Sequence, residues 1–227
     1  MIKRHKVQLN NYGITMIEMI VSFALLAIFL VAASAFISSI TSLYYSVKGE
    51  TYARQVSDIL MQKIESEIDG AKFGNDEVNS KSNPKITVGK PTNQSVDEGI
   101  GDTIDLIDKT DTHIRIFRSS NESNPTSGEI VVHYYPVGSS SAIDWKFDDS
   151  VYNGYRVEEL HFIRGDQLNS FPAASDYGLD TSAQYGKDVV VVCLKLNSDK
   201  YSDFYSYRFI KMYNYKDILG DNGEGNN

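Results

Sequence analysis

An uncharged apolar run near the N-terminus constrains this chain more than any other feature. Residues 19–47 contain no Asp, Glu, Lys, Arg or His and are rich in Leu, Ile, Val, Phe and Ala. About 20 such residues are enough for a helix that crosses a bilayer. Residues 1–13 carry Lys3, Arg4 and Lys6 and no acidic residue. This asymmetry predicts a cytoplasmic N-terminus and an extracytoplasmic remainder.

Three interpretations of this segment compete. A conventional secretory signal would be cleaved at the small residues Ala33, Ser34 and Ala35, and the mature chain would start at Phe36. An uncleaved segment would act as a plain membrane anchor. The third interpretation depends on residues 13–18, just before the run, which read Gly, Ile, Thr, Met, Ile, Glu.

These residues, with the basic leader and the apolar run, resemble the type IV pilin family. The family pattern is a short basic leader, a Gly, an apolar residue, Thr, two apolar residues, Glu and a long apolar helix. Gly13, Ile14, Thr15 and Glu18 occupy the corresponding positions. Ile14 is a mild departure, because the family more often has Phe, Met or Leu there.

The resemblance implies a maturation step and a role in assembly. Prepilin peptidase would cleave after Gly13, and Ile14 would become an N-methylated N-terminus. Glu18, with Thr15 beside it, would serve assembly by pairing with the terminal amine of a neighbouring subunit. A carboxylate near hydrocarbon is costly unless it is paired, so this pairing would favour a docked subunit over an isolated one.

Beyond Lys48 the helical pattern becomes amphipathic. Apolar residues recur at three- and four-residue steps and charged residues fill the opposite face. The apolar stripe is Ala53, Val56, Leu60, Ile64, Ile68 and Ala71, and the charged face is Arg54, Asp58, Lys63, Glu65, Glu67 and Asp69. The pattern predicts one helix over residues 14–69 that stops at Gly70 or Gly74. We expect a globular domain to cover the stripe, with a coiled-coil partner as the alternative.

Strand patterns separated by turn signals fill the C-terminal half. Residues 74–101 predict a long loop with one short strand at 85–88. The further predicted strands are 103–107, 113–117, 129–135, 156–163, 189–196 and 205–213. Val190, Val192, Leu194 and Leu196 share one face, as do Leu160 and Phe162, and we expect both sets to pack on the helix stripe. The predicted fold class is α+β, with a long N-terminal helix packed against an antiparallel sheet, as the pilin resemblance implies.

The predicted organisation has five parts. They are a cleaved basic leader at 1–13, a transmembrane and filament-core helix at 14–47, an amphipathic continuation at 48–73, a globular α+β head at 74–219 and a disordered tail at 220–227. Residues 165–187 join two predicted strands and are long for a hairpin, which marks them as functional or mobile.

No constellation of catalytic or metal-binding residues stands out. His113, His133 and His161 occur singly in predicted strands without metal-ligand spacing. Cys193, the single cysteine, excludes an internal disulfide and is predicted to be a small buried residue. Asp148 and Asp149 predict a turn rather than a carboxylate pair. Oxygen-rich segments at 176–188 and 221–224 lack the EF-hand pattern. We therefore expect no enzyme, no catalytic residue, no metal and no cofactor.

Charge and aromatic content bear on partners. With 22 basic and 30 acidic residues the formal charge is −8, which argues against direct nucleic-acid binding. The exception would be a local basic patch formed by Lys85, Lys90, Arg115 and Arg118. Tyr205, Tyr207, Phe209 and Tyr213 would share one strand face, either packed across strands or exposed for subunit contact.

The resemblance therefore predicts a structural subunit of a type IV pilus or a related pseudopilus. A minor pilin is favoured because the chain is large and lacks a C-terminal disulfide. The succession of strands over residues 157–209 also weakly resembles J-type minor pseudopilins. Expected partners are other pilin subunits, prepilin peptidase, the assembly platform and membrane lipid before assembly. Type II secretion and competence pseudopili, a secreted or anchored binding protein, and an anchored enzyme remain as alternatives.

Overall fold

The computed structural model describes residues 15–71, 86–89, 99–121, 124–139 and 141–212. The chain divides into two compact units, Met1–Ser46 and Val47–Asn227. The first unit contains the N-terminal part of helix α1 (Met16–Gly70). The second unit, called the head below, contains the remainder of α1 and all the described strands.

Helix α1 stops at Gly70, one of the two predicted positions, and its apolar stripe is buried. All six predicted stripe residues, Ala53, Val56, Leu60, Ile64, Ile68 and Ala71, are essentially inaccessible to solvent. Full burial of one such aliphatic side chain contributes about 1.5–3 kcal/mol, so the stripe accounts for much of the attachment of the helix. Directly after the helix, Ala71 forms a β-bridge with Asp108.

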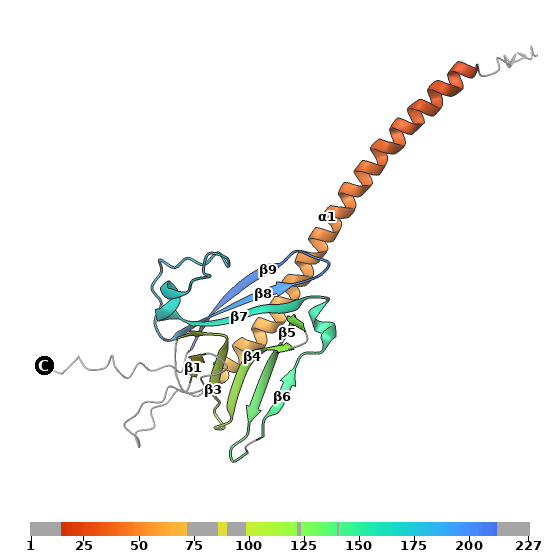
Figure 1. Ribbon diagram of the computed structural model, residues 1–227. Coiled ribbons are helices and arrows are strands. Elements are labelled where there is room, and N and C mark those ends of the chain that lie inside the picture. Colours follow the sequence, from red (N-terminus) through yellow and green to blue (C-terminus); the bar gives the residue numbers. More distant parts are fainter. Residues whose placement is uncertain (1–14, 72–85, 90–98, 122–123, 140, 213–227) are drawn as a thin grey trace, which may run out of the picture. The chain divides into compact units, whose positions relative to one another are not determined.

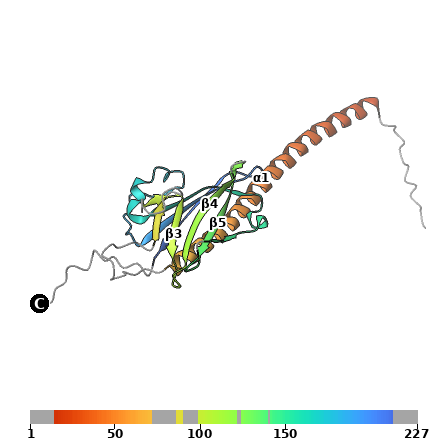
Figure 2. The ribbon, with the colours of Figure 1, turned by 60° about the horizontal axis from the view of Figure 1, so that its bottom comes forward.

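Nine antiparallel strands form one sheet around the head part of α1 (Figures 1 and 2). They are β1 (Ile86–Gly89), β2 (Ile100–Gly101), β3 (Thr103–Ile107), β4 (His113–Asn121), β5 (Asn124–Tyr135), β6 (Ile143–Lys146), β7 (Arg156–Arg164), β8 (Val189–Asn197) and β9 (Phe204–Lys211). The strand order is β1-β3-β4-β5-β7-β8-β9, with β2 paired to β7 and β6 paired to β5. The predicted α+β class, with a helix packed on an antiparallel sheet, is confirmed.

The inner faces of the strands close over the helix as predicted. Val190, Val192, Leu194 and Leu196 of β8 and Leu160 and Phe162 of β7 belong to one buried cluster with the helix stripe. On β3 and β4, Ile104 and Ile116 complete the same cluster from the other half of the sheet. The predicted hairpin at 103–117 is also correct, because β3 pairs with β4 around a turn that Asp108 stabilises by accepting from Thr110 and Thr112.

Several short elements were not predicted from the sequence. Strands β2 and β6 and the 3-10 helices η1 (Asp149–Tyr152) and η2 (Gly165–Ser170) fall in segments without apolar periodicity. Strand β4 extends to Asn121 and β5 begins at Asn124, so their hairpin runs through a polar stretch. The predicted turn at 148–149 is correct, since the Asp148 side chain caps η1 by accepting from the Ser150 amide.

The connection between β7 and β8, residues 165–188, covers the outer face of the sheet. Its Leu168, Phe171 and Tyr177 are buried and pack on Val191 and Cys193 of β8. The segment therefore forms a second layer over the outer face of the sheet, and its predicted functional or mobile character stays a prediction. Cys193 is free and buried as predicted, and burial raises the pKa of its thiol to about 12.

Polar contacts join the charged face of α1 to the sheet on both sides of the stripe. The Tyr134 hydroxyl donates to Glu67 at 2.6 Å and accepts from the Lys63 ammonium at 2.9 Å. Across the sheet, Arg208 of β9 pairs with Asp58 and Glu65 of the helix. This face was predicted to be a charged helix surface, but the strands contact much of it.

Gly49 marks a close approach between α1 and the loop after β8. A Cβ at this position would lie 2.6 Å from Cδ1 and 2.9 Å from Cβ of Tyr201. The Tyr201 ring stacks on Tyr155 with 5.7 Å between centroids, and the Tyr155 hydroxyl donates to the Gly49 carbonyl at 3.0 Å. These contacts leave Tyr201 little room to move aside.

We predict that Gly49→Ala destabilises the head despite the better helix propensity of Ala. Overpacking costs about 1–3 kcal/mol, and the gain in propensity offsets about 1 kcal/mol of it. Gly70→Ala is the matched control, since nothing lies within 4 Å of a Cβ there. Urea unfolding of the full chain in detergent, followed by tyrosine fluorescence, should give a lower midpoint for Gly49→Ala only. Equal midpoints for the two variants would contradict the close approach.

Candidate functional site

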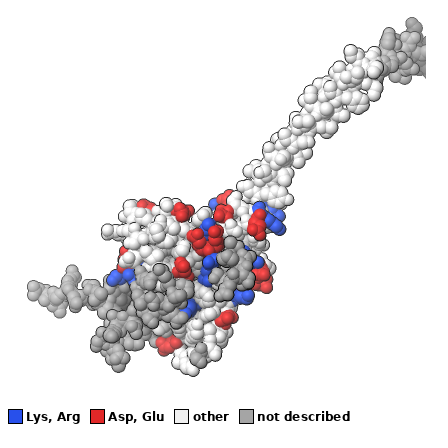
Figure 3. Space-filling view, viewed as in Figure 1, with Lys and Arg blue, Asp and Glu red and all other residues white. Residues whose placement is uncertain are grey.

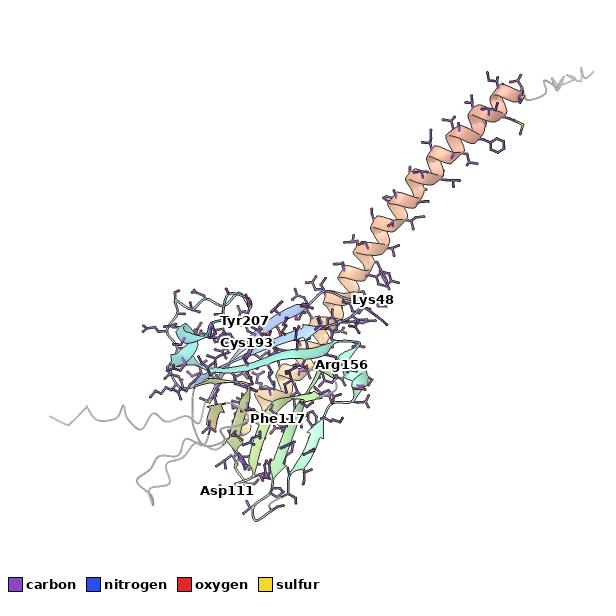
Figure 4. All side chains as sticks on the ribbon, viewed as in Figure 1. Lys48, Asp111, Phe117, Arg156, Cys193 and Tyr207 are labelled. Atoms are coloured by element: carbon purple, nitrogen blue, oxygen red, sulfur yellow. The ribbon has the colours of Figure 1, made fainter. Side chains whose placement is uncertain are left out.

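The N-terminal part of α1 has an apolar surface on every side. Large hydrophobic residues from Met16 to Val47 are exposed around the helix, and Phe29 retains 67% of its accessible surface. Their side chains radiate in all directions (Figure 4), and the face of this part seen in Figure 3 carries neither blue nor red atoms. Among the described residues, α1 is the one helix long and apolar enough to cross a membrane. A helix that is apolar all round belongs in a membrane or among other helices.

Three hydroxyl side chains within this segment bond to the helix itself. Ser34, Ser39 and Thr41 each donate to the carbonyl four residues earlier, at 2.8, 3.1 and 2.9 Å. An unpaired hydroxyl in an apolar environment would cost free energy, and these back-bonds avoid that cost. The less hydrophobic, serine-containing part of the apolar run is therefore compatible with lipid or with packing among other helices.

Thr15 and Glu18 form a capping box at the start of α1. The Thr15 amide and hydroxyl both donate to Glu18 Oε2, at 2.8 and 2.9 Å. In return the Glu18 amide donates to Thr15 Oγ1 at 3.3 Å. The reciprocal bonds satisfy amides that the first helical turn otherwise leaves without partners.

This geometry fixes one carboxylate at the border of the apolar surface. The helix dipole favours an anion in the first turn, and Thr15 limits the rotamers available to Glu18. A carboxylate held in this way can accept a further hydrogen bond or pair with an amine. The structure thus brings together the predicted site residues Thr15 and Glu18, whereas Gly13 and Ile14 lie outside the described residues and their roles stay predictions.

The sequence reasoning missed the bond between Thr15 and Glu18, although a signal was present. Thr followed three residues later by Glu, just before an apolar run, is the sequence signature of a capping box. Thr15 had been assigned to assembly only through its place in the family pattern. Its position gives it a concrete role, which is to orient the Glu18 side chain.

Each histidine of the head lies beside an aspartate on a neighbouring element. His113 lies 3.1 Å from Asp105, His133 lies 3.2 Å from Asp144, and His161 lies 2.8 Å from Asp102. Each histidine therefore has a carboxylate neighbour from another part of the sheet or its connections. Across the described residues, no three His, Cys, Asp or Glu side chains are grouped as metal ligands.

Of the four residues of the predicted basic patch, one arginine has its charge paired with a carboxylate. Arg115 is mostly buried and its Nε lies 2.7 Å from Asp105 Oδ1, so its charge is paired. Arg118 donates to the Val157 carbonyl at 3.5 Å. Lys85 and Lys90 lie outside the described residues.

The aromatic face of β9 was predicted to be either packed across strands or exposed, and it is partly both. Tyr205 and Tyr207 are 40% and 44% exposed, while Phe209 packs against Tyr185 with 4.7 Å between centroids. Tyr177 of the β7–β8 connection makes an edge contact with Tyr205 at 5.5 Å. Cys193 and Tyr207, labelled in Figure 4, are cross-strand partners on β8 and β9. Tyr213, predicted on the same face, lies outside the described residues.

We predict that Thr15→Ala loosens the first turn of α1, whereas Thr15→Ser leaves it intact. Loss of an N-cap hydroxyl typically costs about 1 kcal/mol, so the first turn should be open about fivefold more often in Thr15→Ala. Amide hydrogen exchange of the full chain in detergent micelles should therefore be about fivefold faster over residues 15–19 in Thr15→Ala. Unchanged exchange in that variant would mean that the capping box does not hold in solution.

Comparison with known proteins identifies the N-terminal segment. Residues 9–34 match the family model described as the prokaryotic N-terminal methylation motif. No curated protein and no solved structure matches the chain. The matched segment covers the predicted cleavage position, the capping box and the first part of the apolar helix, and it fits a membrane-anchored, single-pass protein. The chain therefore carries the prepilin-type signal of type IV pilins and pseudopilins, which prepilin peptidase processes.

Proposed function

We propose that this chain is a minor pilin, a structural subunit of a type IV pilus or a related pseudopilus, and not an enzyme. One observation carries the proposal. The methylation motif at residues 9–34 runs directly into a helix whose apolar side chains are exposed on every side. The head has its own core, and none of those side chains belongs to it.

The proposed mechanism begins in the membrane. The segment 14–47 spans the bilayer, with the leader 1–13 in the cytoplasm and the head outside. Prepilin peptidase then cuts between Gly13 and Ile14, and Ile14 is methylated. The assembly platform lifts the subunit out of the membrane, and the apolar surface of α1 exchanges lipid contacts for contacts with the helices of other subunits.

Glu18 sets the axial position of the incoming subunit in this mechanism. Its carboxylate, oriented by Thr15, pairs with the terminal amine on Ile14 of a neighbouring subunit. Both charges would be costly near hydrocarbon if left alone, so a docked pair is favoured over two isolated subunits. The bonds to Thr15 hold the carboxylate in place before the neighbouring amine arrives.

The head contributes outward-facing surface rather than chemistry. A large head without an internal disulfide fits a minor subunit better than a shaft subunit, and this supports the minor-pilin assignment. The paired Arg115 and the excess of acidic residues argue against nucleic-acid contact by this subunit, even if the machine is a competence pseudopilus. A type II secretion pseudopilus would use the same N-terminal mechanism.

We predict that the protein recovered from its native cells starts at Ile14 with one added methyl group. Mass spectrometry of the N-terminal peptide measures both features in one spectrum. A start at Phe36 would instead indicate a conventional secretory signal and overturn the proposal. An intact Met1 in cells with active prepilin peptidase would leave only a membrane anchor.

We predict that Glu18→Ala is processed and inserted normally but enters filaments poorly. The amount of subunit in sheared filaments, divided by the amount in membranes, should fall at least tenfold, which corresponds to the loss of about 1.4 kcal/mol of docking free energy. Glu50→Ala is the matched control, because Glu50 is an exposed carboxylate on the same helix and pairs with Arg54. Wild-type assembly of Glu18→Ala would exclude the role given to Glu18.

A further inference from the structure

One histidine on the outer face of the sheet joins the β2–β3 corner, strand β7 and the β7–β8 connection. His161 of β7 directs Nδ1 to Asp102 Oδ1 at 2.8 Å, on the corner between β2 and β3. Its Nε2 lies 3.5 Å from Glu159 Oε2 on the same strand. The imidazole ring packs against Phe171 and Tyr177 of the β7–β8 connection, with centroids 5.4 and 6.4 Å away.

Glu159 continues this chain of contacts into the β7–β8 connection. The Tyr177 hydroxyl donates to Glu159 Oε2 at 3.1 Å, the same oxygen that faces His161. A register shift between Val157 and Glu159 places both Glu158 and Glu159 opposite Lys195 of β8. Lys195 lies 2.9 Å from Glu158 and 3.7 Å from Glu159, so its charge is directed mainly to Glu158.

The number of protons on the imidazole decides how many of these contacts can exist together. A charged ring has an N–H on both nitrogens and can donate to Asp102 and Glu159 at once. A neutral ring has a single N–H and must give up one of the two. The contact with Asp102 is the shorter, so deprotonation gives up the donation to Glu159. The carboxylate that accepts from Tyr177 then loses one of the groups that hold it in place.

The groups around His161 favour its charged form. Asp102 faces it from the β2–β3 corner, Glu159 from its own strand, Lys195 and Cys193 from β8, and Tyr177 from the connection. Burial lowers the pKa of His161, but the hydrogen bond and charge of Asp102, with the charge of Glu159, outweigh burial and raise the pKa above its ordinary 6.5. Burial raises the pKa values of Cys193 and Tyr177, so both stay neutral near pH 7.

We propose that protonation of His161 holds the β7–β8 connection against the outer face of the sheet. We call the contacts of His161 with Asp102 and Glu159, and of Glu159 with Tyr177, the latch. In the charged state the latch holds the β2–β3 corner, β7 and Tyr177 together. In the neutral state the connection loosens and exposes the apolar residues beneath it, beside the half-exposed Tyr205 and Tyr207. The proposal concerns the head alone and does not depend on the proposed filament role.

The expected direction follows from the raised pKa. A group with a higher pKa in the folded state stabilises that state fully below its unfolded pKa, here about 6.5, and loses this effect as the pH rises through the folded pKa. The connection is therefore most firmly docked in mildly acidic medium. Each unit by which the pKa is raised corresponds to about a tenfold loss of protection across the titration.

Hydrogen exchange of the full chain in detergent micelles, from pH 5.5 to pH 8.5, tests the latch. After correction for intrinsic exchange, protection over residues 165–188 should fall with rising pH while protection of β4 and β5 stays constant. His161→Gln should abolish the pH dependence. His133→Gln is the matched control, because His133 also pairs with an aspartate but lies away from the connection, and it should keep the wild-type profile.

Asp102→Asn provides a second, independent test. The Asp102 side chain is more than half exposed, so we expect the variant to fold. It should weaken the pH dependence without removing it, because Glu159 remains. A flat profile in the wild-type protein would overturn the latch. So would an undiminished pH dependence in His161→Gln or Asp102→Asn, with native protection of β8 as the sign that the variant has folded.

Discussion

A single helix that changes its surroundings partway along its length is the constraint on which this structure depends. From Met16 to Val47, helix α1 is apolar on all sides, and the large side chains there stay exposed to solvent in the described part of the chain. From Gly49 onward only one stripe is apolar, and the sheet covers it. The first part gains stability from lipid or from other helices, as fits the membrane-anchored protein that the methylation motif at residues 9–34 indicates. The second part gives the head a core of its own.

The head covers that stripe with a sheet, and the outer faces of the two halves of the sheet have different surroundings. The strands β7 and β8 are buried on both faces, because the β7–β8 connection forms a second layer over Ile163, Val191 and Cys193. The continuous run of apolar residues at 189–194 is typical of a strand in this position. By contrast, β4 and β5 present paired charges and histidines on their outer face, such as Arg115 with Asp105. In the first half, Cys193 therefore lies beneath a packed second layer, which also covers the ring of His161.

Sequence patterns predicted the parts of this fold in which local periodicity and burial agree. The helix stripe, its stop at Gly70 and the long strands were all visible as repeats of apolar residues. The short strands β2 and β6 and the 3-10 helices were not, because pairing with distant strands creates them. The site divides in the same way. Gly13, Ile14 and Glu18 were assigned from a contiguous motif, but the partners of His161 lie as far as 59 residues away in the chain and no local signal joins them.

The polar contacts between α1 and the sheet have a different function from the apolar stripe. Hydrophobic burial is proportional to area and has no preferred direction, so it tolerates some rotation of the helix in its groove. Arg208 with Asp58 and Glu65 on one side, and Tyr134 with Lys63 and Glu67 on the other, permit only one rotation and one axial position. Partly exposed ion pairs of this kind contribute only about 0–1 kcal/mol each. These contacts therefore fix how residues 49–70 of the helix sit against the sheet, while the stripe supplies the stability.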